Sequence, residues 1–200
     1  MKNKHQQLQK LYADFEQAAA EGKAGAACNK GCAFCCTDAG VIDITTMEGL
    51  VILDRMTALP KPRAGLITKA LQQDMKKREQ GRASACPFLM KNKACLIYDV
   101  RPFACRRMYS LRTCSKETPP VVSRRVMDLA GQTIAALQRL DDNGYSGHIS
   151  YILCMLQAPR FAAVYCAGGF KPEEIAVFGK THRIAFNRQV PDADPALTIP

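Results

Sequence analysis

The sequence predicts a single, mainly helical domain with one small β-hairpin and a cysteine-rich core. Three observations lead to this fold class. Apolar residues recur at helical spacing in several segments, two short apolar runs flank the turn sequence KNK at 91–93, and ten cysteines are concentrated in a few stretches. The chain has 200 residues, enough to bury a core without disulfide staples. It shows no internal repeat and no linker, so we expect one domain over residues 1–180.

An amphipathic helix is expected over residues 4–21. Leu8, Tyr12 and Phe15 recur there at spacings of three and four, and Gly22 follows as a stop signal. This spacing places the three apolar side chains on one face, which we expect to be buried against the rest of the domain.

The segment VIDITTMEGLVILDRM, residues 41–56, predicts a short extended run that leads into a second helix. Thr45 and Glu48 have the Thr-x-x-Glu spacing of a capping box, in which each side chain bonds a backbone amide near the helix start. The sequence PKP at 60–62 breaks this helix, and residues 63–80 form the next one. The apolar face of that next helix is expected to consist of Leu66, Ile67, Ala70, Leu71 and Met75.

The segment after Gly81 changes character. Its apolar runs at 88–90 and 94–98 form the expected hairpin, and Pro102 can start a short helix that carries Cys105. This part of the chain therefore has less regular structure than the helices before it.

The C-terminal part returns to helical periodicity. Ser123 caps a helix that reaches about Leu140, and residues 147–167 form one or two further helices divided at Pro159. Residues 181–200 have little apolar surface to bury, and we expect them to be a mobile tail.

The most informative feature of the sequence is CNKGCAFCC at 28–36, which places four cysteines in nine positions. A second, more widely spaced block follows after 49 residues, and two further cysteines stand apart. The first block is Cys28, Cys32, Cys35 and Cys36, the second is Cys86, Cys95, Cys105 and Cys114, and the separate residues are Cys154 and Cys166.

The chemistry of cysteine depends on the cellular compartment. The N-terminal stretch MKNKHQQLQKLYADFEQAAAEG lacks the apolar segment of a signal peptide, and no apolar run approaches the roughly 18 residues that span a bilayer. We therefore expect a cytoplasmic protein without a membrane partner, whose thiols stay reduced. In that compartment a cysteine cluster indicates metal binding first and catalysis second.

The formal net charge of +10 raises the question of nucleic-acid binding. Four metal-bound thiolates would lower that charge to about +6. The basic residues are scattered along the chain, which has no tryptophan and no RNP-like run. We expect a solvated basic surface and no nucleic-acid partner. We do expect a protein or redox partner, which the sequence does not identify.

The cysteine spacings suit a metal site built from two segments. Short spacings such as C-x2-C let one turn of backbone direct two sulfurs at one centre, and a second segment commonly supplies the other ligands. Side chains of adjacent residues usually diverge, so Cys35 and Cys36 need not bind the same metal atom. One tetrahedral zinc ion would leave several clustered cysteines unused, which favours an iron–sulfur cluster or two metals.

The cysteine pattern resembles a known family. The first block, together with CPFL at 86–89 and CLIYDVRPFACR at 95–106, is similar to the YkgJ-type CxxCxxCC family of zinc- or iron-chelating proteins, also called iron–sulfur-cluster-containing proteins. The resemblance implies a metal-chelating region over 28–107 and does not account for the helical part at 121–180. It implies a chelating set of Cys28, Cys32, Cys35, Cys36, Cys86, Cys95 and Cys105.

Charged and apolar neighbours complete the expected site. Arg101 and Arg106 would offset the negative charge of a thiolate-rich centre without binding the metal themselves. Cys114 lies outside the family pattern, and its role stays open. Cys154 and Cys166 are interpreted as small buried apolar residues.

Histidine adds one further candidate ligand. His148 precedes an expected core helix and is interpreted as a helix-start residue, with zinc ligation as the alternative.

The motifs of several enzyme classes are missing. The sequence shows no paired cysteine and histidine, no βαβ context for thioredoxin chemistry and no glycine-rich phosphate loop. Our first interpretation is a protein with a cysteine-ligated iron–sulfur cluster of the cubane, 4Fe-4S type, with a role in electron transfer or redox sensing. Two alternatives stay open: a structural zinc (Zn2+) site in a partner-interaction module, and a cluster-dependent modifying enzyme.

Overall fold

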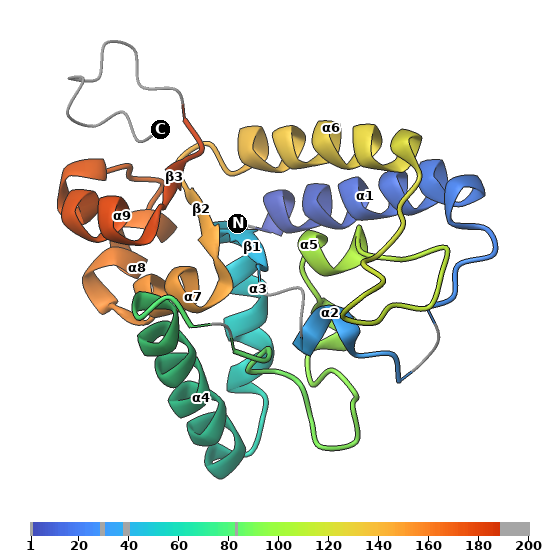
Figure 1. The fold of residues 1–200 in the computed structure, drawn as a ribbon. Helices are drawn as coiled ribbons and strands as arrows, with labels where there is room; N and C mark the ends of the chain where they lie inside the picture. Colours follow the sequence, from blue (N-terminus) through green and yellow to red (C-terminus); the bar gives the residue numbers. More distant parts are fainter. Residues whose placement is uncertain (1, 29–30, 38–40, 83, 189–200) are drawn as a thin grey trace.

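The computed structural model describes residues 2–28, 31–37, 41–82 and 84–188. Helices dominate these residues, and three short antiparallel strands form a sheet in the order β1-β2-β3 (Figure 1). The predicted mainly helical single domain is confirmed. The sheet, however, is not the hairpin that the sequence predicts.

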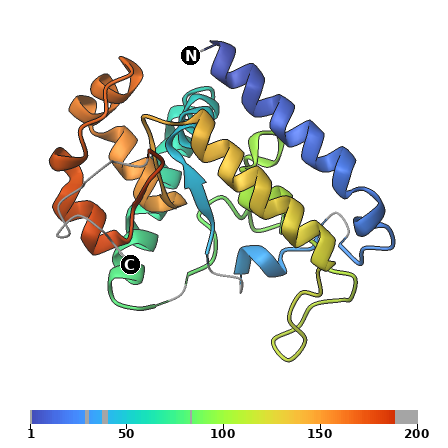
Figure 2. The ribbon, with the colours of Figure 1, turned by 90° about the horizontal axis from the view of Figure 1, so that it is seen from above.

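Helices α1 (Lys2–Ala19) and α6 (Arg124–Leu140) lie side by side along one edge of the molecule (Figure 2). Their apolar faces meet because each helix carries bulky apolar side chains at helical spacing. The predicted burial of Leu8, Tyr12 and Phe15 is confirmed. We call the cluster that these helices form with their neighbours the N-terminal core: Leu8, Tyr12, Phe15, Ala19, Met47, Phe103, Tyr109, Val126, Ala130 and Leu137.

Helix α3 (Thr46–Thr57) runs through the centre of the molecule, next to α7 (Ile149–Gln157). The predicted capping box is present: the Glu48 backbone amide donates to Thr45 Oγ1, and the Thr45 amide donates to Glu48 Oε2. Both helices bury apolar residues in a second cluster, which includes the fully buried Ile52.

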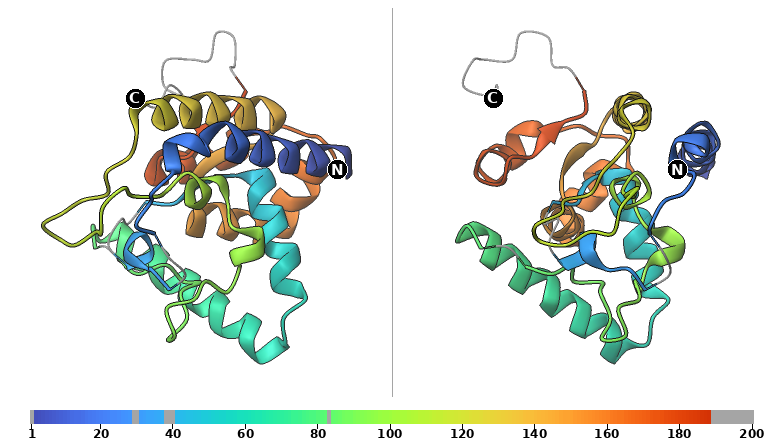
Figure 3. Two further views of the ribbon diagram at one scale, coloured as in Figure 1. Left: turned by 90° about the vertical axis from the view of Figure 1, so that its right-hand side faces the viewer. Right: turned by 45° about the vertical axis from the view of Figure 1, so that its right-hand side comes forward.

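Helix α4 (Lys61–Glu79) projects from the body of the molecule (Figures 1 and 3). Ile67 and Leu71 are buried as predicted, but Leu66 is 68% exposed. The prediction for Leu66 is wrong because the rest of the fold covers only a narrow stripe of this helix. The spacing of apolar residues alone does not show which stripe is covered.

The sheet joins three distant segments: β1 (Asp43–Thr45), β2 (Tyr145–His148) and β3 (Ala185–Phe186). In the register of the first pair, Asp43 lies opposite His148. The segment DDNGYSG, 141–147, follows α6, and its last three residues belong to β2. Strand β2 therefore links the centre of the fold to the C-terminal segment.

The chain stays packed beyond the expected end of the domain. Helix α9 (Ala176–His182) is followed by Ile184, which is fully buried, and then by β3, which pairs with β2. The expectation of a mobile tail from residue 181 is therefore wrong for this part, because one buried isoleucine and a strand pairing hold it. The remainder of the predicted tail, 189–200, lies outside the described residues.

The division of the helical segment 147–167 at Pro159 is confirmed. Helix α7 ends at Gln157, and α8 (Pro159–Cys166) begins at the proline. No single helix in the described ranges has the length and hydropathy of a membrane span; α7 and α8 meet both conditions only together, across a bend of 93°.

The second cysteine segment has little regular structure. Between residues 84 and 123 the described chain forms only η2 (Tyr98–Val100) and α5 (Phe103–Arg106). The predicted hairpin is reduced to one bridge between Leu89 and Cys95, closed by a turn in which Lys93 has a φ of 61°. This segment runs beneath α1 as a set of loops (Figures 1 and 3).

Candidate metal centre

Helix α2 (Phe34–Thr37) presents two adjacent thiols. A hydrogen bond from the Cys36 thiol is the main cause that lowers the pKa of Cys35 to about 6, and the same bond raises the pKa of Cys36. The ionisation of one thiol therefore depends on the other, and Cys35 carries a negative charge more readily than Cys36.

The second cysteine segment is joined to α2 through the main chain. The Cys86 amide donates a hydrogen bond of 2.7 Å to the Cys36 carbonyl. The bridge between Leu89 and Cys95 then returns the chain toward the same place. Burial raises the pKa of the Cys86 thiol to about 11, and the neighbouring Cys95 thiol acts in the same direction. Cys36, Cys86 and Cys95 thus become neighbours although 49 residues separate the two blocks.

Helix α5 adds Cys105, and a buried carboxylate holds this helix in place. The Phe103 amide, at the start of α5, donates to Glu48 Oε1 at 2.7 Å, and the Tyr12 hydroxyl donates to the same oxygen at 2.6 Å. The Phe103 ring packs edge-on against Phe15 at 4.7 Å between centroids. Sequence analysis assigns Glu48 only a capping role, because its contacts to α1 and α5 arise from packing.

Five thiols form one group, which we call the inner thiol group: Cys35, Cys36, Cys86, Cys95 and Cys105. Burial is the main cause that raises the pKa of Cys105, and negative charge on Cys86, Cys95 and Cys35 raises it further. These side chains are half-buried, so the group lies near the surface.

Three further thiols form a second group around Cys28, and we call Cys28, Cys32 and Cys114 the outer thiol group. The Ala27 amide donates to the Ser110 carbonyl at 2.8 Å, which brings the first block to the loop that carries Cys114. Burial raises the pKa of Cys28, and the Cys32 and Cys114 thiols act in the same direction. Cys28 and Cys32 are exposed, in contrast to the inner group.

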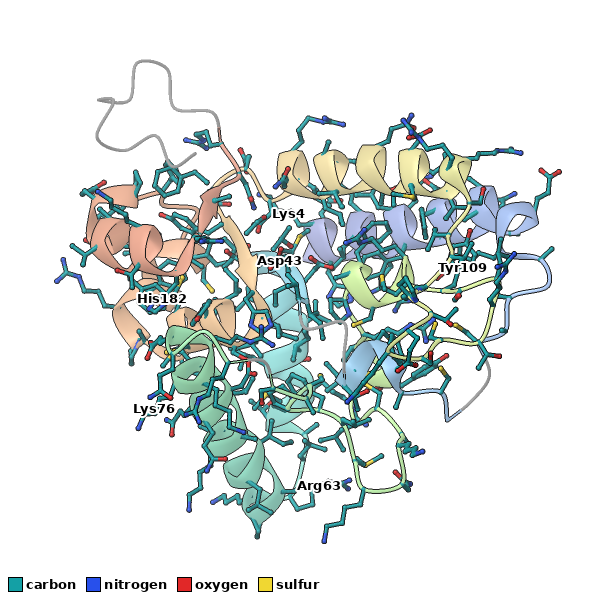
Figure 4. All side chains as sticks on the ribbon, in the orientation of Figure 1. Lys4, Asp43, Arg63, Lys76, Tyr109 and His182 are labelled. Atoms are coloured by element: carbon teal, nitrogen blue, oxygen red, sulfur yellow. The ribbon has the colours of Figure 1, made fainter. Side chains whose placement is uncertain are left out.

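The loop that carries the outer group is fixed by Tyr109, labelled in Figure 4. The Tyr109 hydroxyl donates to the Gly22 carbonyl at 3.0 Å and accepts from the Ser123 amide at 2.9 Å. The last two cysteines lie elsewhere: Cys154 is half-buried in α7, and Cys166 is exposed at the end of α8. The prediction that Cys166 is buried is therefore wrong.

The two candidate arginines have different positions. Arg101 stacks on the Tyr98 ring at 4.1 Å, and its charge acts to lower the pKa of Cys95, although burial dominates and raises that pKa. Arg106 instead donates through Nε to the Arg101 carbonyl at 2.9 Å and stacks on Tyr12 at 4.5 Å. Arg101 thus offsets thiolate charge, whereas Arg106 fixes the loop that carries the cysteines.

The donor set suits a thiophilic metal. In the described ranges, no three histidine, cysteine or acidic side chains already surround one metal position. The inner group nevertheless gathers five thiols, and negative charge on Cys35, whose own pKa is lowered, raises the pKa of the other four. A bound cation would remove this repulsion, and thiolate ligands select zinc, iron and iron–sulfur clusters.

The comparison with known families agrees with this chemistry. Residues 27–121 match the family CxxCxxCC, described as "Putative zinc- or iron-chelating domain". The match includes both cysteine segments and Cys114, and the helices after residue 121 lie outside it. No curated protein and no solved structure matches the chain. The family model that matches residues 27–121 is the one that the cysteine pattern resembles, so the resemblance is confirmed for this part of the chain.

Proposed function

We propose that this chain binds an iron–sulfur cluster through the inner thiol group and acts in electron transfer or redox sensing. The observation that carries the proposal is the convergence of five cysteines from the two blocks, supported by the family's description as zinc- or iron-chelating. Adjacent thiols such as Cys35 and Cys36 can both serve as ligands in a centre with several metal atoms.

The position of the inner group also favours a redox role. A bound cluster would supply one-electron chemistry, with a potential set by hydrogen bonds to sulfur, net charge and solvent exposure. The half-buried thiols place the centre close to the surface, where a partner protein can exchange electrons with it. The charge of Arg101 beside Cys95 acts in the direction that stabilises thiolates.

The outer group bears on the number of centres. The family resemblance includes Cys28 and Cys32 in the chelating set, and negative charge on Cys114 acts to raise the pKa of Cys28. We propose that these thiols belong to the same metal-binding surface. Eight neighbouring thiols exceed the needs of one tetrahedral ion. The number of metal atoms bound per chain therefore distinguishes a protein with one metal centre from a protein with two.

The test is elemental analysis and a visible absorption spectrum of protein purified without oxygen and without added metal. We expect iron, acid-labile sulfide and a broad absorption band that bleaches in air. Cys105→Ser should lose most of the iron, whereas Cys166→Ser, which replaces an exposed cysteine outside both groups, should keep it. Full iron in Cys105→Ser would exclude the inner group as the ligand set.

A structural zinc site is the second candidate, and the loop character of residues 84–123 favours it. A segment with so little regular structure gains stability from a metal that ties its ends together. In that case the purified protein is colourless and contains zinc in place of iron, and chelation unfolds the cysteine segments. A colourless zinc protein would overturn the redox proposal and leave the metal-binding surface as a scaffold for a partner.

A further inference from the structure

A buried histidine stands beside the inner thiol group with one ring nitrogen unpartnered. His148 ends β2 and caps α7, and its side chain is only 8% exposed. Its Nδ1 accepts a hydrogen bond from the Ser150 amide at 3.3 Å. Its Nε2 is buried and has no hydrogen-bond partner within the described part of the chain.

The surroundings of the ring fix its orientation. Asp74, almost fully buried in α4, accepts from the Ser150 hydroxyl at 2.6 Å and from Arg78 Nε at 2.9 Å. Asp74 Oδ2 lies 3.8 Å from His148 Nδ1, and the ring of Tyr151 meets the imidazole edge to face. These contacts come from two helices, so the imidazole cannot turn without disturbing both.

The hydrogen-bond pattern assigns the proton of the ring. Because Nδ1 of His148 accepts from the Ser150 amide, a neutral imidazole carries its hydrogen on Nε2. A buried N–H group without an acceptor is unfavourable, and native structures almost always provide one. We therefore looked for an acceptor in the space that His148 borders.

That space is a narrow cleft shared with the cysteine site. Cys35, Cys36 and Cys86 line it together with His148, Arg78 and Ser84. The guanidinium of Arg78 uses its Nε on Asp74, which leaves two further nitrogens as donors. Arg78 can only donate, and the Ser84 hydroxyl already donates to the Ala85 carbonyl but can still accept. The other side-chain acceptors of the cleft are the cysteine sulfurs, which carry negative charge when they bind a metal.

We infer that His148 donates its Nε2–H to a sulfur atom of the metal-loaded inner thiol group and thereby raises the reduction potential of the centre. The inference rests on the proposed function, because the potential is defined only where a redox metal is bound. His148 is a positioning residue here and does not bind the metal. Hydrogen bonds to sulfur stabilise the more negatively charged, reduced form of such a centre, so their loss lowers the potential.

The test compares three variants of the anaerobically purified holoprotein. His148→Phe removes the donor and keeps a ring of similar size, whereas His148→Gln keeps an N–H donor. His182→Phe is the matched control, because His182, labelled in Figure 4, stacks on Tyr151 at 4.3 Å between ring centroids. His182 is not among the described residues that line the cleft. Iron content and reduction potential are measured for each protein by elemental analysis and spectroelectrochemical titration.

We expect His148→Phe to retain iron with a more negative potential, His148→Gln to lie nearer the parent protein, and His182→Phe to match it. An unchanged potential in His148→Phe would overturn the inference. Loss of iron in both His148 variants, with full iron in His182→Phe, would identify a metal ligand and would also overturn it. Iron loss in His148→Phe that His148→Gln restores supports the donor role.

Zinc in the purified protein would overturn the proposed redox function and leave the hydrogen bond testable. In cobalt-substituted protein, the bond predicts a shift of the sulfur-to-cobalt absorption band in His148→Phe that His182→Phe lacks. The same band in both variants would overturn the inference independently of the redox proposal.

Discussion

The helical scaffold and the cysteine region hold their conformations by different means. The scaffold, formed by α1, α3, α4, α6 and α7, buries two apolar clusters and satisfies its backbone groups within long helices. The cysteine region, the described parts of 26–37 and 84–114, has two α-helices of four residues each. It is held by a few buried side chains, such as Phe88, Ile97 and Phe103, and by single long-range hydrogen bonds. We therefore expect the scaffold to fold without a metal and the cysteine region to need both the scaffold and a bound metal for full rigidity.

The largest expected effect is removal of the metal. Chelation under reducing conditions, or the Cys105→Ser substitution, should greatly increase amide hydrogen exchange in the cysteine region while the scaffold helices stay protected. Hydrogen exchange read by mass spectrometry, with circular dichroism for helix content, measures both regions at once. If the helix content is lost when the metal is removed, the two regions unfold as one cooperative unit. The proposed difference between the scaffold and the cysteine region is then wrong.

The second effect concerns Glu48, which connects the two regions. Glu48→Gln replaces a buried carboxylate that accepts from Tyr12, Thr45 and Phe103, so the free energy of unfolding should fall by about 2 kcal/mol. The variant should also lose metal faster to a competing chelator, because α5 is less firmly held. Glu174→Gln, at an exposed ion pair, is the control and should change neither quantity.

The third effect tests the scaffold alone. Burial raises the pKa of Asp141 to about 7, although hydrogen bonds from Tyr165 and the Met47 amide act in the opposite direction. A carboxyl with a raised pKa in the folded state binds its proton more tightly there, so it stabilises the fold at low pH. This stability is lost as the pH rises from the unfolded value toward 7, a change on the order of 2 kcal/mol between pH 5 and 8.

Urea denaturation of the parent protein and of Asp141→Asn at both pH values isolates this contribution. The amide cannot ionise, so the difference in stability between the two proteins should depend on pH although Asp141→Asn is less stable overall. A difference that is independent of pH would show that Asp141 is ionised throughout the range.

The smallest expected effect is on the exposed face of α4. Leu66→Gln should change the free energy of unfolding by less than about 0.5 kcal/mol, because the side chain is 68% exposed. Leu71→Ala, four positions from the buried Ile67 on the same helix, should cost about 2–4 kcal/mol. Thermal unfolding of both variants makes the comparison, and equal losses would place Leu66 in a buried contact.

Local signals explain which parts of the fold the sequence predicts. Periodicity locates the helices, and the capping box at Thr45 marks a helix start within one residue, because both depend on neighbours in the chain. Strand β3 and the burial of Ile184 depend on pairing with residues about forty positions away, which no local pattern encodes. The exposure of Leu66 has the same origin, since the packing partners of α4 decide which stripe is covered.

The candidate site likewise has features that the sequence predicts and features that depend on the packing of distant segments. Spacing alone predicts that the cysteines of the two blocks form a metal site, because short cysteine spacings direct several thiols at one centre. The second role of Glu48, the loop contacts of Arg106 and the free Nε2 of His148 appear only when distant segments are packed together. For His148, the nearest sequence signal is its position immediately before a strongly apolar helix.

The hydrogen bond between the Cys86 amide and the Cys36 carbonyl has a consequence for biosynthesis. On the ribosome, the first four cysteines emerge about seventy residues before Cys105, so a metal ion offered early meets only half of its ligands. The two segments meet only after α3 and α4, which lie between them, have been made and have folded back. We therefore expect the metal to be inserted late, after the scaffold helices have folded, into a cysteine region that becomes rigid only when the metal binds.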